Sequence, residues 1–276
     1  MSIMQSLLAV TSGGIVGLSL GLLGGGGSIL AVPLLLYLVK LKDPHVVIGT
    51  SALAVSVNAY VNLVAHARTG HVRWRPAVLF ALPGVAGAAI GSIVGKSLHG
   101  STLLFLFALL MLIIAGMMAF RIKSPEKARV PQPEGQAVLM ENAPPQNMTT
   151  WSLIKILTAG FLVGALSGFF GIGGGFLIVP ALILSTNMTL IEAIGTSLFA
   201  VGTFGLTTAV TYSLAGLINW LAFLEFVAGG ALGGFVGVRI AGRLSRQRKA
   251  LNYVFSGVLL VVALYMLYRN AMALHL

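Results

Sequence analysis

The sequence contains no cysteine and few charged residues. Cysteine is absent and only six of the 276 residues are acidic. The lack of cysteine excludes disulfides, cysteine-ligated zinc and a thiol nucleophile. The sequence also has neither the GxxxxGK[ST] pattern of ATP-binding loops nor the HExxH pattern of zinc proteases. We therefore expect no enzymatic activity, no cofactor and no metal site.

The residues that are present are mainly apolar. Hydrophobic residues make up 57% of the chain and the mean hydropathy is +0.98, values typical of a helical protein that crosses a membrane several times. The net charge of +11 could suggest nucleic acid as a partner. However, most basic residues lie in short loops beside apolar segments, which is how membrane topology is encoded. We expect a lipid bilayer as the surroundings and no nucleic acid as a partner.

One glycine-rich stretch occurs twice. Gly24-Gly25-Gly26-Gly27 is followed by Ser28 and, after four apolar residues, by Pro33; Gly171-Ile172-Gly173-Gly174-Gly175 is followed by Phe176 and later by Pro180. Further along, Gly49-Thr50-Ser51 recurs as Gly195-Thr196-Ser197. An internal duplication is therefore the first organising feature of the chain.

Each half contains five apolar segments. In the first half they cover about Ile3 to Leu23, Ile29 to Val39, Val46 to Ala67, Pro76 to Val94 and Thr102 to Phe120. In the second half they cover about Trp151 to Phe170, Phe176 to Leu184, Leu190 to Ser213, Leu221 to Val238 and Leu251 to Tyr268. Most reach the ~20 residues needed to span a bilayer, but the second segment of each half is too short. We predict about eight to ten transmembrane segments, with the short ones broken or re-entrant.

The distribution of Lys and Arg favours an inverted arrangement of the halves. If the first two segments of each half cross and return, only four of the seventeen basic residues face one side: Lys40, Lys42, Lys96 and Arg269. A single continuous span instead would give parallel repeats and a nearly even division of charge. Because Lys and Arg concentrate on the cytoplasmic side, we predict an all-α membrane protein with two inverted five-segment repeats. Both termini would then be periplasmic.

A segment rich in proline and charge joins the two halves. Residues 122–150 carry five of the ten prolines and little apolar periodicity. We predict a first transmembrane repeat at 1–121, a flexible cytoplasmic linker at 122–150 and a second transmembrane repeat at 151–276.

The paired glycine runs are candidate binding sites. Glycine allows a sharp turn and close approach to a ligand, and it leaves the amides that start the following helices without intrahelical partners. Helix N-termini carry partial positive charge, so they suit an anion such as a sulfonate or carboxylate. The alternative is that these glycines only permit close helix packing, as we expect for the other glycine rows of the chain. These rows are Gly84, Gly87, Gly91 and Gly95, and Gly230, Gly233 and Gly237.

The third segment of each half carries polar residues. Asn58 and Asn62 share one helical stripe with Ser51, while threonines predominate in the second half. Threonines often bond their own helix backbone, but two amides in lipid are costly. We expect Asn58 and Asn62 to line the substrate pathway, with helix-to-helix bonding as the alternative.

Two further ionisable residues are candidates for proton coupling. Glu225 lies inside an apolar segment, and an intramembrane carboxylate is a functional candidate by default. It also lies about one turn from Trp220 and could be hydrated. His66 falls near the predicted inner interface, where we favour an interfacial role, with proton transfer as the alternative.

These motifs resemble those of one transporter family. Two halves with a glycine-rich break ending in proline, a following Gly-Thr-Ser and a Trp after the next span look like the TauE/SafE sulfite exporter family, over nearly the whole chain. The resemblance implies a secondary transporter that moves sulfite, a sulfonate, sulfoacetate or a related small anion across the bacterial inner membrane. The direction of transport would be export. The alternative to a secondary transporter is an anion-selective channel. The sequence is compatible with a homo-oligomer.

The residues expected to hold the anion come from both repeats. They are Gly24, Gly25, Gly26, Gly27, Ser28, Thr50, Ser51, Asn58 and Asn62 in the first half, and Gly171, Gly173, Gly174, Gly175, Thr196 and Ser197 in the second.

Overall fold

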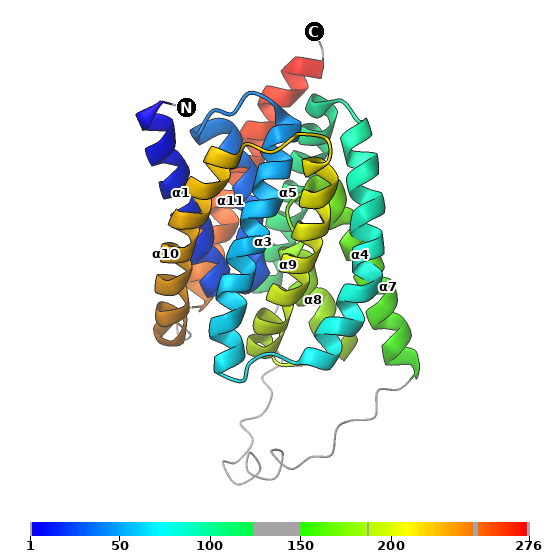
Figure 1. Ribbon diagram of the computed structural model, residues 1–276. Coiled ribbons are helices and arrows are strands. Elements are labelled where there is room, and N and C mark those ends of the chain that lie inside the picture. The colour runs from blue at the N-terminus through cyan, green and yellow to red at the C-terminus, as the bar shows by residue number, and fades with distance from the viewer. Residues whose placement is uncertain (1, 124–149, 187, 245–247, 275–276) are drawn as a thin grey trace.

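The computed structural model is a bundle of helices (Figure 1), described for residues 2–123, 150–186, 188–244 and 248–274. Within these residues there are no strands, and seven helices are long and apolar enough to cross a membrane. Three shorter apolar helical segments accompany them. The prediction of an all-α membrane protein is therefore confirmed. Most of the predicted linker, 124–149, lies outside the described residues.

The two halves contain matching series of helices. The first half consists of α1 (Ile3–Leu23), η1 (Gly24–Leu30), α2 (Ala31–Pro33), η2 (Leu34–Leu38), α3 (Pro44–Arg68), α4 (Trp74–Ser97) and α5 (Gly100–Lys123). The second half consists of α7 (Thr150–Phe170), α8 (Gly175–Thr186), α9 (Leu190–Ser213), α10 (Trp220–Leu244) and α11 (Arg248–Leu274). The single helix α8 thus corresponds to the short series η1, α2 and η2.

Local sequence signals set where the third helix of each half begins. The Asp43 carboxylate accepts hydrogen bonds from the amides of His45 (2.8 Å) and Val46 (3.4 Å), and Pro44 occupies the first turn of α3. At α9, Thr189 and Glu192 form a capping box. Both caps satisfy amides that the helix itself leaves unpaired.

The outer helices pack across the two halves. Helix α1 packs along α10, and α7 packs along α4. A β-carbon on Gly17 would collide with the carbonyl oxygen of Gly230, and one on Gly91 with that of Ala165. The glycine rows therefore let the backbones approach directly, which is the packing role expected for Gly84 to Gly95 and Gly230 to Gly237.

The first two segments of each half form a hairpin. The side-chain amide of Gln5, in the first turn of α1, donates to the carbonyl oxygen of Val39 at 3.3 Å. In the second half, Ser152 near the start of α7 donates to the carbonyl oxygen of Ser185 near the end of α8 at 2.8 Å. Each hairpin therefore enters and leaves the bundle at one end, with its glycine-rich turn inside.

Helices α3 and α9 form the antiparallel centre of the bundle (Figure 1). They are mostly buried, whereas less than half of each other span is buried. The Ser56 hydroxyl donates to the Gly202 carbonyl at 2.6 Å where the two helices cross. Gly49, near the start of α3, packs against Tyr212 near the end of α9, and Gly195 packs against His66 in the same way. Which end of the bundle faces the cytoplasm stays a prediction.

Candidate functional site

The two glycine-rich turns touch inside the bundle. A β-carbon on Gly25 would collide with the backbone of Gly175, and a β-carbon on Gly175 would collide with that of Gly25. Ser28, which follows the first glycine run, is fully buried, and its hydroxyl donates to the Gly25 carbonyl at 2.8 Å. The predicted glycine sites of the two halves are therefore brought together at one place.

The first turn differs from the expected open break. Gly24 has a positive φ of 67°, but Gly24–Leu30 continues as a 3₁₀-helix. The i to i+3 bonds of such a helix occupy its amides from the first turn onward. The expectation that the amides at the start of Ser28 to Val39 lack intrahelical partners is therefore wrong. Because η1 runs on into α2 and η2, this turn keeps the dipole of a longer helix but not its free amides.

The second turn is open. Gly171, Gly173 and Gly174 all have positive φ, between 65° and 69°, and α8 begins only at Gly175. The hydrogen bonds at this turn run from the Gly171 amide to the Ser167 carbonyl and from the first amides of α8 to the Gly174 carbonyl. Among the described residues, no hydrogen bond uses the amides of Gly173 and Gly174. This turn thus retains the free backbone donors that an anion requires.

The open turn lies between the central helices. A β-carbon on Gly173 would stand 3.0 Å from Val201 of α9 and 3.3 Å from Val55 of α3. Both valines lie near the middle of their helices. The sequence contains no Lys or Arg between residues 2 and 39 or between 156 and 238. The donors at this place are therefore neutral.

Ser51 and Ser197 occupy equivalent positions beside the turns. Ser51 donates to the Ile48 carbonyl at 2.9 Å and lies 3.4 Å from the Gly171 carbonyl oxygen. Ser197 donates to the Ile194 carbonyl at 2.8 Å. Both hydroxyls therefore have a partner in their own helix.

Thr50 and Thr196 connect the two halves. The Thr50 hydroxyl accepts a hydrogen bond from the amide of Asn219 at 2.9 Å, just before α10. The Thr196 hydroxyl accepts one from the amide of Arg73 at 3.0 Å, just before α4. The two bonds are equivalent in the repeats, and each fixes the start of a helix from the other half. These two predicted binding residues thus have a structural use.

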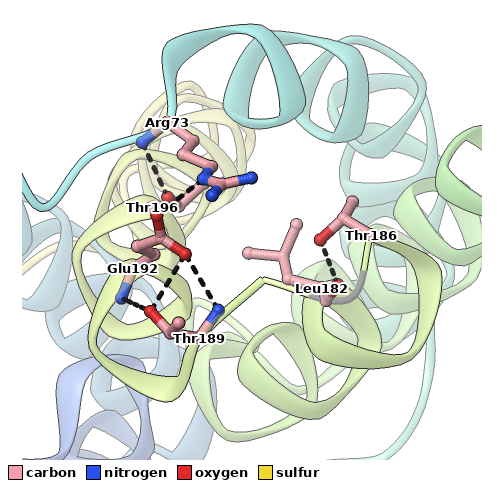
Figure 2. A network of polar contacts seen from close by, with 6 residues as sticks. All are labelled: Arg73, Leu182, Thr186, Thr189, Glu192 and Thr196. Carbon is pink, nitrogen blue, oxygen red and sulfur yellow. Dashed lines mark hydrogen bonds and ion pairs between the residues drawn. The ribbon is translucent and has the colours of Figure 1, made fainter. Parts of the chain in front are cut away.

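An ion pair reinforces only one of these connections (Figure 2). Arg73 Nε donates to Glu192 Oε1 at 2.8 Å, while Glu192 Oε2 accepts from the amide and hydroxyl of Thr189. In the same view, Thr186 donates to the Leu182 carbonyl at the end of α8. The equivalents of Arg73 and Glu192 at the other end are Asn219 and Val46, which cannot form an ion pair. The two ends of the bundle are therefore held differently.

Asn58 and Asn62 of α3 pack against α10. Asn62 donates to the Asn58 carbonyl at 2.8 Å and packs on Gly234. Asn58 packs on Gly230 and is fully buried, and neither its side-chain oxygen nor its nitrogen has a partner among the described residues. In the other half, Phe204 packs on Gly84 at the equivalent place. The amide of Asn58 therefore has no polar equivalent in the other half.

The two coupling candidates lie apart. His66 lies near the end of α3 beside His71, with ring centroids 6.4 Å apart. Glu225 lies near the start of α10, a half-buried residue whose Oε2 has no partner among the described residues. Since α3 and α10 run in the same direction, with Asn58 level with Gly230, the two groups are separated by on the order of 20 Å along the helices. They do not form a pair.

Ser167 is not among the binding residues predicted from the sequence. This residue of α7 is fully buried, its hydroxyl has no partner among the described residues, and it packs against Gly174. A signal was available, because its equivalent in the first half is Leu20. A difference between the halves beside the glycine runs could have pointed to it.

The comparison with known protein families decides the identity of the chain. The profile described as "Sulfite exporter TauE/SafE" matches residues 9–266. The chain belongs to the TauE/SafE family. The family resemblance inferred from the repeated glycine motifs is therefore confirmed.

Relatives of this TauE/SafE chain are described as membrane transporters. One from Xylella fastidiosa strain Temecula1, "Probable membrane transporter protein", is 49% identical over 270 residues, which cover 98% of either chain. "Probable membrane transporter protein YunE" of Bacillus subtilis is 27% identical over 273 residues, covering 97% of this chain and 99% of the relative. No solved structure matches the chain.

The family assignment and the helices agree on the class of protein. The chain is a multi-pass membrane transporter of the TauE/SafE family and not an enzyme. Among the described residues, no group of three or more His, Asp or Glu could hold a metal ion.

Proposed function

We propose that this protein is a secondary transporter that exports a small sulfur-containing or organic anion, of the sulfite, sulfonate or sulfoacetate type. The observation that carries the proposal is the open turn between α7 and α8, where backbone amides remain free in the interior of the bundle. Buried amides without a partner are costly, and an anion supplies the missing acceptors. The family name supports a sulfur oxoanion as the cargo.

The protein works in the bacterial inner membrane, with both termini periplasmic and residues 122–150 cytoplasmic. This orientation follows the excess of Lys and Arg on the linker side of the bundle. Export of an anion agrees with the membrane potential, since moving one negative charge out of a negative interior gains about 2.3 kcal/mol per 100 mV. Such a transporter can run as a uniporter, without coupling through His66 or Glu225.

A carrier accounts for the packing better than the alternative of an anion channel. The glycine turns are closed by direct contact between Gly25 and Gly175, and the surrounding Ser28, Ser51 and Ser167 are fully buried. An open pore would expose these groups to water. Alternating access instead requires an occluded centre between two moving halves.

The test is transport by the purified protein in liposomes. Flux of radiolabelled sulfite or sulfoacetate should saturate with concentration, and unlabelled anion on the opposite side should accelerate it by counterflow. Flux that rises without saturation and carries single-channel conductance would establish the channel instead. Absence of flux for sulfite, sulfoacetate and simple sulfonates would contradict the proposed cargo.

A further inference from the structure

Ser167 differs from three other buried serines near the glycine turns. Ser28, Ser51 and Ser197 each donate a hydrogen bond to a carbonyl three residues earlier. Ser167 is fully buried but its hydroxyl bonds to nothing among the described residues. Since buried polar groups nearly always have partners, an unpaired hydroxyl at this place indicates a group that is supplied from outside the chain.

The Ser167 side chain lies against the open turn. A β-carbon built on Gly174 would lie 2.7 Å from the Ser167 β-carbon and 3.1 Å from its Oγ. The unbonded amides of Gly173 and Gly174 belong to the same turn, directly before the N-terminus of the twelve-residue helix α8. Backbone and side-chain donors thus lie together where the dipole of α8 also favours negative charge.

The first half offers no equivalent site. Leu20 stands at the sequence position of Ser167, while Ser19 lies against Gly27, the equivalent of Gly174. The amides that correspond to Gly173 and Gly174 lie in the 3₁₀-helix η1, whose own hydrogen bonds occupy them. The first turn meets the second at the backbone of Gly25, which packs on Gly175. The two glycine runs, although similar in sequence, are therefore chemically unequal.

The charge of the ligand follows from the absence of cationic side chains. No Lys or Arg occurs between residues 156 and 238 or between 2 and 39, so neither hairpin brings a cation to its turn. Neutral donors compensate the lost hydration of a single negative charge far better than that of two, because the cost of burying charge rises steeply with its magnitude.

We infer that the turn between α7 and α8 is a one-sided site for a monovalent oxoanion, held by the Ser167 hydroxyl and the amides of Gly173 and Gly174. This inference rests on the proposed transport of a small anion, and it narrows the cargo to monovalent sulfonate-type anions. The first glycine run covers the site without binding the anion. Ser167 is the side chain that recognises it.

The test is anion binding by purified full-length protein, measured as thermal stabilisation over a range of anion concentrations. Methanesulfonate serves as the monovalent probe and sulfate, at equal ionic strength, as the divalent one. Wild type should be stabilised by methanesulfonate and not by sulfate. Ser167→Ala should bind methanesulfonate about ten- to a hundredfold more weakly, the range expected for loss of a hydrogen bond to a charged group. Without anion, its melting temperature should not fall.

Ser92→Ala is the matched control. Ser92 is also a fully buried serine, but its hydroxyl donates to the Ala89 carbonyl at 2.9 Å in α4. Ser92→Ala should bind methanesulfonate as wild type does. If Ser167→Ala does not fold, Ser167→Cys carries the test, because it keeps the size of the side chain and replaces a strong donor by a weak one.

The outcomes separate this inference from the proposed function. Wild-type protein that transports methanesulfonate while Ser167→Ala binds methanesulfonate with unchanged affinity would overturn the one-sided site and leave the transporter intact. Stabilisation of wild type by sulfate as strong as that by methanesulfonate would overturn the preference for a monovalent anion. Wild-type protein that neither binds nor transports any sulfonate or sulfite would overturn the proposed function itself.

Discussion

The backbone of Gly25 lies directly against the backbone of Gly175, so that the glycine runs of the two halves meet at a contact with no room for a side chain. Either residue carries the same constraint, because a β-carbon on one would collide with main-chain atoms of the other. Main-chain atoms cannot rotate away as a side chain can. The contact therefore requires glycine on both sides.

Gly25→Ala and Gly175→Ala should each destabilise the protein by about 1–3 kcal/mol, the usual cost of overpacking, and should abolish transport. Thermal unfolding in detergent and flux in liposomes measure the two effects. Gly116→Ala is the control, since a β-carbon there meets nothing within 4 Å. It should leave stability unchanged or raise it slightly. If both Gly25→Ala and Gly175→Ala transport at the wild-type rate, close contact between these two backbones is not required for transport.

Gly173→Ala should lose transport as well as stability. Its φ of 69° penalises a side chain, and a β-carbon would stand between Val55 and Val201 in the open turn. Gly216→Ala supplies the control, because Gly216 has a φ of 70° but open space around it, in the loop before α10. Both variants should lose about 1–2 kcal/mol from backbone strain. Only Gly173→Ala should lose binding of methanesulfonate; equal binding in both would place the anion elsewhere.

Asn58→Leu should impair transport without lowering stability. The Asn58 amide is fully buried with no partner among the described residues. Its replacement by Leu removes the free-energy cost of burying a polar group without hydrogen bonds. Asn270→Leu is the contrast, because the Asn270 amide donates to Tyr37 and to the Met266 carbonyl, and its loss should lower the melting temperature. Asn62→Leu should also lower flux. Wild-type transport rates in both variants would mean that Asn58 and Asn62 only contribute to contacts between helices.

Thr50→Val and Thr196→Val should lower stability by similar amounts, about 1 kcal/mol each, since each removes the acceptor of a helix-initiating amide. Glu192→Gln should cost less than about 1 kcal/mol, because its partner Arg73 is 52% exposed and exposed ion pairs are weak. Chemical or thermal unfolding measures all three. A threonine variant that keeps its stability but loses anion binding would show that the hydroxyl binds the substrate.

The orientation in the membrane can be read with fused reporters. A reporter placed after Leu276 should be periplasmic, and one inserted near Gly135 should be cytoplasmic, because most of the basic residues lie on the linker side. Both positions lie outside the described residues. Alkaline phosphatase and a fluorescent protein report the two compartments in intact cells. Reporters on the same side would contradict inverted repeats.

Much of the architecture follows from the sequence because it depends on composition and local pattern. Apolar segments of about twenty residues determine the spans, and the spacing of Gly84, Gly87, Gly91 and Gly95 determines a face on which another backbone can pack. The duplication is visible for the same reason, since equivalent local signals recur in each half. Asp43 and Thr189 similarly determine where their helices begin.

The properties of the site were decided only by the tertiary structure. Two similar glycine runs fold differently, one as a 3₁₀-helix and one as an open turn. Thr50 and Thr196 looked like ligands but bond to amides more than a hundred residues away, in the opposite half. Ser167 becomes a candidate only in the fold, where α7 meets Gly174 and the hydroxyl has no partner among the described residues. Where a hydrogen bond joins or fails to join distant parts of the chain, only the folded structure decides it, because no local pattern brings those groups together.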